Sequence, residues 1–169
     1  MTAAALVFLM QFVFVFCLSY AIVSDLRRLI IPNWIPIALA VTFPVFALMH
    51  AGVDRVPAHV AVAVLVFLIS MIFFVADWMG GGDIKLLAAV MLWLGPGAAP
   101  EFLVVMSLLG AALAITLMIV RSFPSAVDPW GQTIVARRVI ELARLGQCPY
   151  GVAIGAAALM FAPRVFGFA

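Results

Sequence analysis

Two aspartates in this 169-residue chain, Asp25 and Asp83, adjoin long apolar segments, where an ionised side chain is costly unless it has a partner or a function. When two carboxyl groups meet in a medium of low dielectric constant, they cannot both ionise cheaply and therefore share a proton. The ionised member can take a proton from water while the protonated member donates to a carbonyl oxygen. That chemistry is the acid–base hydrolysis of an amide bond.

Each aspartate also has a simpler structural explanation. Asp83 follows three glycines, residues 80–82, which can form a turn while the carboxylate caps the next helix. Asp25 precedes Arg27 and Arg28, which can balance it as an acid at a membrane interface. From the residues alone, a cap and an active site explain Asp83 equally well, and the two roles can coexist.

The composition predicts an integral membrane protein. Hydrophobic residues make up 68% of the chain and charged residues 9%, whereas a globular domain has about half and a quarter. The apolar runs are continuous instead of alternating with polar residues, which excludes a membrane β-barrel. We therefore expect an all-α polytopic membrane protein, forming a single domain over residues 1–169.

Apolar runs bounded by proline, glycine and charge predict a bundle of about six transmembrane helices. These runs are residues 3–23, 34–49, 58–75, 84–94, 102–120 and 149–168. The fourth run is short, because Asp83 to Leu94 makes only about 18 Å of helix, against a hydrocarbon thickness of about 30 Å. Asp83 should therefore be recessed in a pocket between neighbouring helices. An amphipathic segment, 130–145, is typical of a helix at the membrane surface, its basic face toward anionic lipid.

The Lys and Arg residues favour an orientation with the N-terminus outside, since cytoplasmic loops retain positive charge. In that orientation only Arg55 and Arg164 face outward, and the other basic residues are cytoplasmic. Those residues are Arg27, Arg28, Lys85, Arg121, Arg137, Arg138 and Arg144. Asp25 and Asp83 then share the cytoplasmic side, where Asp77 is a simple interfacial acid.

Cysteine and histidine give no indication of a metal site. Cys17 and Cys148 are far apart and form no CxxC or Cys/His spacing, so we expect neither a zinc site nor a disulfide. His50 and His59 fall on the outer side in the predicted topology, across the membrane from the two aspartates. We expect both histidines to be surface residues.

Two stretches of this chain together resemble the type IV prepilin peptidases, a branch of the GxGD intramembrane aspartyl proteases. One is GGGDIKLL at residues 80–87, and the other is DLRRLIIPN at residues 25–33. A late Pro149-Tyr150-Gly151 at the start of the last helix extends the resemblance over nearly the whole chain. The resemblance implies a catalytic pair, Asp25 and Asp83, with no metal and no organic cofactor.

The resemblance also implies residues that contact the substrate. They are Gly80 and Gly82 of the GxGD pattern, Lys85, Pro32, Asn33 and Tyr150. Alternatives stay open for the last four. Lys85 can extend to the interface, Pro32 can start the second helix with Asn33 as its cap, and an interfacial aromatic such as Tyr150 needs no catalytic role.

The implied activity is removal of the basic leader peptide from type IV prepilins and pseudopilins at the cytoplasmic face of the bacterial inner membrane. The implied partners are that substrate, membrane lipid and the pilus or secretion assembly machinery, with no nucleic acid. Larger members carry a CxxC-containing domain linked with N-methylation. This chain has no CxxC and resembles the short form associated with Flp-type or tight-adherence pili, so N-methyltransferase activity is not expected. Two other classes stay open, a non-catalytic assembly scaffold and a small proton-coupled transporter.

Overall fold

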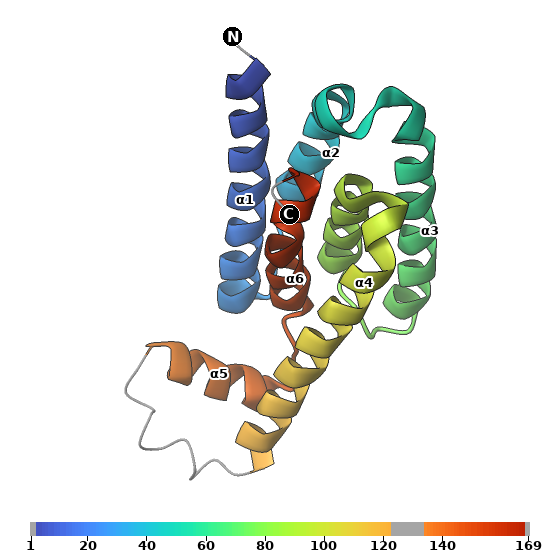
Figure 1. The fold of residues 1–169 in the computed structure, drawn as a ribbon. Coiled ribbons are helices and arrows are strands. Elements are labelled where there is room, and N and C mark those ends of the chain that lie inside the picture. The colour runs from blue at the N-terminus through green and yellow to red at the C-terminus, as the bar shows by residue number, and fades with distance from the viewer. Residues whose placement is uncertain (1–2, 123–133, 168–169) are drawn as a thin grey trace.

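The computed structural model describes residues 3–122 and 134–167, with side chains described throughout except at 3–4, 50–51 and 134–136. This part of the chain is helical and contains no strand (Figure 1). Its elements are α1 (Ala3–Arg28), α2 (Trp34–Phe46), a π-helix η1 (Ala47–Ala51), a 3₁₀ turn η2 (Val53–Arg55), α3 (Val56–Val75), α4 (Gly81–Ser122), α5 (Ile134–Leu145) and α6 (Tyr150–Val165). The prediction of an all-α fold is confirmed.

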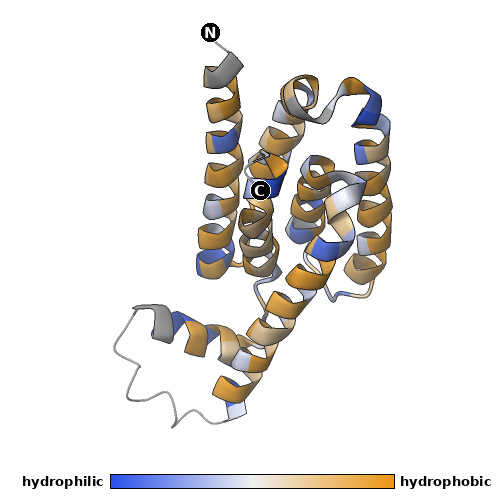
Figure 2. Cartoon of the chain, in the orientation of Figure 1, coloured by the Kyte–Doolittle hydropathy of each residue, from blue (hydrophilic) through white to orange (hydrophobic). Residues whose placement is uncertain are grey.

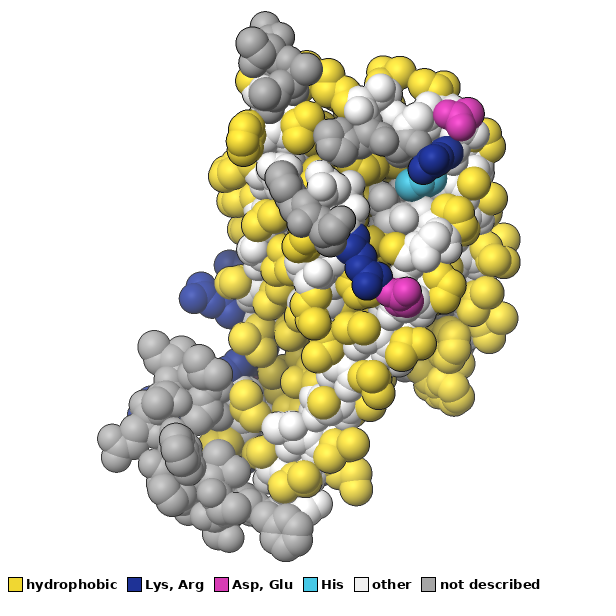
Figure 3. All heavy atoms as spheres, in the orientation of Figure 1, with side chains coloured by type: hydrophobic (Ala, Val, Ile, Leu, Met, Phe, Trp, Pro, Cys, Tyr) yellow, Lys and Arg dark blue, Asp and Glu magenta, His cyan; other side chains and the backbone are white. Residues whose placement is uncertain are grey.

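The helices have the length and composition of a membrane bundle. Three are long and apolar enough to cross a membrane, at Ala5–Arg28, Val53–Val75 and Gly81–Ser122, and shorter apolar helices cover Trp34–Met49 and Tyr150–Val165. Most of the helical ribbon is hydrophobic in Figure 2, and hydrophobic side chains are spread over the whole described face shown in Figure 3. Large apolar side chains exposed to this extent are stable only in contact with lipid or another apolar partner.

α4 is the element that sets the architecture. Its 42 residues are interrupted at Gly95, whose backbone angles (φ 66°, ψ −176°) are not helical, so the chain turns back on itself there (Figure 1). The first arm, 81–94, and the second arm, 96–122, contain the predicted runs 84–94 and 102–120. α6 packs against both α1 and α4, while α3 packs against α4.

The prediction that His59 is a surface residue is wrong, because its side chain is only 9% exposed. The turn in α4 explains this burial. Pro96 has no N–H, so the carbonyl of Leu92 lacks the donor that a continuous helix would supply. His59 Nδ1 lies 2.8 Å from that carbonyl oxygen, and because the oxygen can only accept, the ring nitrogen donates. The side chain of His50, predicted to be at the surface, lies outside the described residues.

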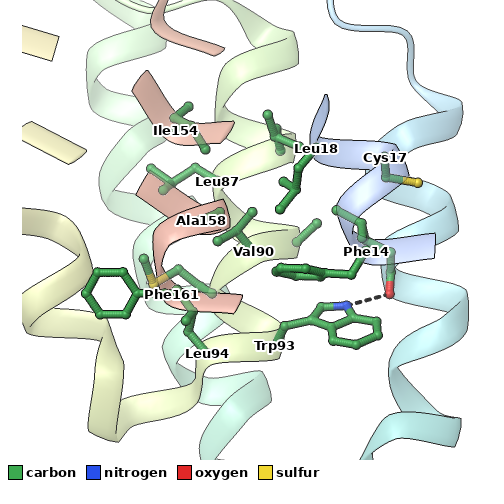
Figure 4. Packing of buried hydrophobic residues seen from close by; sticks show 14 of the residues in the cluster. Phe14, Cys17, Leu18, Leu87, Val90, Trp93, Leu94, Ile154, Ala158 and Phe161 are labelled. Atoms are coloured by element: carbon green, nitrogen blue, oxygen red, sulfur yellow. Dashed lines mark hydrogen bonds between the residues drawn. The ribbon is translucent and has the colours of Figure 1, made fainter. Parts of the chain in front are cut away.

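Aromatic rings fill the bundle at the end near this turn. We call this region the aromatic end, defined by Phe14, Phe43, Phe46, Trp93 and Phe166. Trp93 stacks on Phe46 with ring centroids 4.7 Å apart and meets Phe14 at 5.0 Å. Its indole N–H donates to the carbonyl of Leu39 at 2.9 Å (Figure 4). Phe166 contacts both Phe14 and Trp93, with ring centroids 5.8 and 6.0 Å apart, so these contacts join α1, α2, α4 and the C-terminal segment.

α5 is a helix, as predicted, and its apolar side packs against the protein. Leu142 and Ala143 are almost fully buried, together with Leu117 of the second arm of α4. Arg138 Nε donates to the carbonyl of Leu26 at 2.8 Å, at the end of α1, and the guanidinium also pairs with Glu141 at 2.7 Å. Residues 130–133 of the predicted helix lie outside the described residues. Contact of the basic face with lipid stays a prediction.

Candidate active site

Asp25 lies in the last turn of α1 and is buried, with 4% of its surface exposed. Its Oδ2 accepts a hydrogen bond from the backbone N–H of Val152 at 3.2 Å. α1 ends just beyond it, because Leu29 adopts a left-handed conformation (φ 55°) and donates its N–H to the carbonyl of Asp25 at 2.8 Å. Non-glycine residues rarely adopt this conformation, and such backbone positions cluster at functional sites.

Asp83 lies in the first turn of α4 and performs the predicted capping role. Its Oδ2 accepts a hydrogen bond from the N–H of Gly80 at 3.2 Å, the bond that an acid three residues into a helix makes with the residue before it. The other oxygen, Oδ1, is buried and has no hydrogen-bond partner among the described residues. Capping therefore uses one oxygen of Asp83 and leaves the second available to a substrate or water.

The N-terminus of α6 lies between the two aspartates. The N–H of Gly151 interacts electrostatically with both carboxyl groups, and the carboxyl groups interact with each other. A Cβ at Gly151 would lie 2.8 Å from Asp25 Oδ2 and 2.6 Å from Ile31 Cδ1, so only glycine allows this approach. The free N–H groups and partial positive charge of a helix N-terminus suit an acidic site.

The glycine triplet brings the two sequence motifs into contact. A Cβ at Gly82 would lie 3.0 Å from Ile31 Cβ and 3.3 Å from its carbonyl oxygen, while one at Gly80 would lie 2.9 Å from Asp83 Oδ2. A side chain at either position would push against Asp83 or Ile31. The segment after α1 and the segment before α4 pack directly together because of these glycines.

A hydrogen bond at the surface links the same two segments. Lys85 Nζ donates to Asn33 Oδ1 at 3.0 Å, and both side chains are exposed. Asn33 stands at the N-cap position of α2, as the alternative predicts, but its side chain makes no capping bond there. Pro32 is partly buried, and its carbonyl accepts from the N–H of Ile35 at 3.1 Å, so this proline does lie in the turn that starts α2.

Tyr150 and Cys148 lie on the α6 side of the aspartates. Tyr150 is 38% exposed and close enough to Asp83 to interact electrostatically. It lines a cavity of about 520 Å³ between α3, α4 and α6. Burial raises the pKa of the Cys148 thiol, and the charges of Asp25 and Asp83 raise it further. Cys148 thus senses both carboxylates.

Sequence reasoning missed the contribution of Gly151, Val152 and Ile31. The one available signal was the Pro149-Tyr150-Gly151 stretch, in which a glycine stands at a helix start. The remaining candidate, Asp77, is exposed in the turn before α4, as predicted for an interfacial acid. Within residues 3–122 and 134–167, His, Cys, Asp and Glu form no group of three that could hold a metal ion. The arrangement thus offers two carboxyl groups and backbone N–H donors, which suits hydrolysis with an activated water.

A comparison with known families identifies a relationship over residues 12–115, which match the model of the type IV leader peptidase family. The matched region contains both Asp25 and Asp83, and it ends within the second arm of α4. No curated protein and no solved structure matches the chain.

Proposed function

Because this chain belongs to the type IV leader peptidase family, we propose that it is a membrane-embedded aspartic endopeptidase. Its substrate is a type IV prepilin or pseudopilin, of the Flp or tight-adherence type, from which it removes the basic leader. The observation that carries the proposal is the position of Asp25 and Asp83 on either side of the Gly151 N–H. The two carboxyl groups interact with each other, and carboxyl groups that meet in a medium of low dielectric constant can share one proton.

The reaction requires a water molecule held between the carboxyl groups. The ionised carboxylate removes a proton from this water, whose oxygen attacks the peptide carbonyl carbon, while the protonated carboxyl donates to the carbonyl oxygen. When the tetrahedral intermediate collapses, the C–N bond breaks and the departing amine takes a proton from the carboxyl group that removed it from water. The free Oδ1 of Asp83 is suited to contact either the water or the carbonyl oxygen.

The neighbouring residues form the rim of the proposed site. Gly80 and Gly82 belong to the proposed substrate contacts because they flank Asp83 on the segment that precedes α4. The exposed Lys85 and Asn33 lie at the rim, where an incoming chain would meet them. Pro32 and Tyr150 complete the proposed set of substrate contacts.

We place this site at the cytoplasmic face of the bacterial inner membrane. The distribution of Lys and Arg supports this orientation. Membrane lipid and the pilus or secretion assembly machinery are the proposed partners besides the substrate.

The test is cleavage by the purified full-length protein in lipid vesicles, with a prepilin-type precursor from the same genome as substrate. Mass spectrometry should show the wild-type protein releasing the leader, and Asp83→Asn and Asp25→Asn each releasing none while still inserting. Asp77→Asn is the matched control, because Asp77 is exposed and outside the site, and it should cleave normally. An intact precursor after incubation with the wild-type protein would contradict the proposal, as would proton flux across the vesicle membrane without any cleavage.

A further inference from the structure

The cavity beside Tyr150 is a groove that adjoins the candidate site at Met79 and Tyr150. Its walls come from one face of α3, from both arms of α4 and from the first turn of α6. Met79 and Tyr150 line its end at the aspartates: Met79 precedes Gly80, which donates to Asp83, and Tyr150 precedes Gly151. The volume, about 520 Å³, lies in the range of ligand sites. Neither aspartate lines the groove itself; Tyr150, which lines it and interacts electrostatically with Asp83, connects it to the candidate site.

The second arm of α4 presents small side chains to the groove. Ser107, Gly110, Ala111 and Ala114 line it, and their spacing of three and four residues puts them on one helical face. All except Gly110 are exposed. In membranes, a face of small residues allows the backbone of a second helix to approach closely. A flexible lipid chain gains no comparable advantage from such a face.

Ser70 of α3 supplies an independent indication that the occupant is a polypeptide. The residue is 5% exposed and lines the groove, and its hydroxyl makes no hydrogen bond within the described residues. The hydroxyl oxygen is not among the fully buried unpaired atoms of the described residues, so it remains accessible to an occupant of the groove. A serine in a helix commonly bonds to a carbonyl of the preceding turn, yet Ser70 does not. An unpaired hydroxyl in an apolar wall is costly. A lipid acyl chain cannot bond to it, whereas a peptide can.

We propose that this groove binds the apolar helix of the substrate that follows the scissile bond, with the N-terminal end of that helix at Asp83. The substrate backbone packs against the small residues of α4, and a polar group of the substrate pairs with Ser70. The inference rests on the proposed peptidase function and adds to it the segment of substrate that the enzyme holds. The groove then determines which precursors bind, and the carboxyl groups determine whether they are cleaved.

The first test compares Ala111→Leu with Ala112→Leu. The two alanines are adjacent and exposed, but only Ala111 lines the groove. With the membrane-inserted precursor described above, Ala111→Leu should raise KM by about tenfold or more, while Ala112→Leu behaves as wild type. Ser70→Ala removes a hydroxyl that bonds nothing in the described structure, so it should raise KM with kcat unchanged. Equal KM values in the wild type, Ala111→Leu and Ser70→Ala would overturn the inference.

A second test detects the occupant directly. A photoreactive amino acid is placed at position 111 or 112 in the Asp83→Asn background, which retains the precursor uncleaved. Position 111 should give an adduct with the apolar helix of the precursor, and position 112 should not. Adducts with lipid alone at position 111 would overturn the inference. If the wild type cleaves but the groove variants are unaffected, this inference fails alone; if the wild type does not cleave, the peptidase function fails first.

Discussion

The ring nitrogens of His59 and Trp93 at the aromatic end of the bundle are paired, whereas a carboxyl oxygen at the opposite end has no partner in the described part of the chain. The amide nitrogen of Gln11, on α1 one turn before Phe14, is also buried without a partner among the described residues. Near Phe46 and Trp93, the indole N–H bonds to Leu39 and the His59 ring bonds to Leu92. At the other end, Asp83 keeps a buried oxygen without a partner among the described residues. A buried polar atom without a partner costs free energy, and proteins tolerate that cost mainly where a ligand supplies the missing bond.

Side-chain size differs between the two ends in the same way. Large rings fill the aromatic end, so it holds the helices rigidly together. At the opposite end, which carries Asp25 and Asp83 and which we call the aspartate end, the neighbouring positions are glycines. Gly80, Gly82 and Gly151 have no side chain, so Asp83, Ile31 and Asp25 approach them closely. The comparison indicates that one end supplies stability and the other supplies a precise position for two acids. Substitutions at the two ends should therefore affect different measurements.

The largest effect on cleavage is expected from Gly151→Ala, at the end of the bundle that carries Asp25 and Asp83. The new methyl group would lie 2.8 Å from Asp25 Oδ2, so the carboxyl group or α6 must move. Displacing a catalytic group by about 1 Å can cost about 100-fold in rate, and we expect at least that loss of cleavage. Gly97→Ala is the control, since no atom lies within 4 Å of the added Cβ. Cleavage by Gly151→Ala within a few-fold of the wild-type rate would contradict the role assigned to α6.

At the aromatic end, His59→Ala should lower stability and spare activity. The substitution leaves the part-buried Leu92 carbonyl without its donor, which costs about 1–3 kcal/mol at most. We expect a lower midpoint of thermal unfolding in detergent, with an unchanged cleavage rate per folded molecule. A selective loss of activity, with stability unchanged, would remove the distinction between the two ends.

The smallest effect concerns the ionisation of Cys148. Negative charge on Asp25 and Asp83 disfavours the thiolate and, after burial, contributes to the raised pKa of this thiol. Asp25→Asn and Asp83→Asn should each lower that pKa, so alkylation at a fixed pH below it becomes faster. The measurement is the pH dependence of maleimide labelling in a Cys17→Ala background, with Asp77→Asn as the control. Identical titration curves in all variants would show that Cys148 does not sense the two carboxylates.

The sequence predicts the helices well, because they depend on local information, and it singles out both acids as candidates for the same reason. Continuous apolar runs determine the membrane helices, and Asp25 and Asp83 are conspicuous as acids next to such runs. The short predicted run that ends at Leu94 is the first arm of α4, and the break at Gly95 lies directly after it.

Contacts between distant segments could not be predicted in the same way. Gly151 and Val152 meet Asp25 across more than a hundred residues of chain, and no spacing rule connects them. His59 is buried because a proline in another helix leaves a carbonyl without its donor, which depends on the angle of the turn in α4. Asn33 has the residue type of a helix cap but bonds to Lys85 instead, since α4 brings the amine within reach.

The most direct test of the central claim, that Asp25 and Asp83 act as one unit, is a double-mutant cycle. Single-turnover cleavage of the precursor is measured for Asp25→Asn, Asp83→Asn and the double variant, with insertion and unfolding temperature checked in each. If the two carboxyl groups share one proton and one water, each single substitution should abolish cleavage, by about 10²–10⁴-fold or more, and the double variant should lose no more than either. A single variant that still cleaves at close to the wild-type rate would contradict the account.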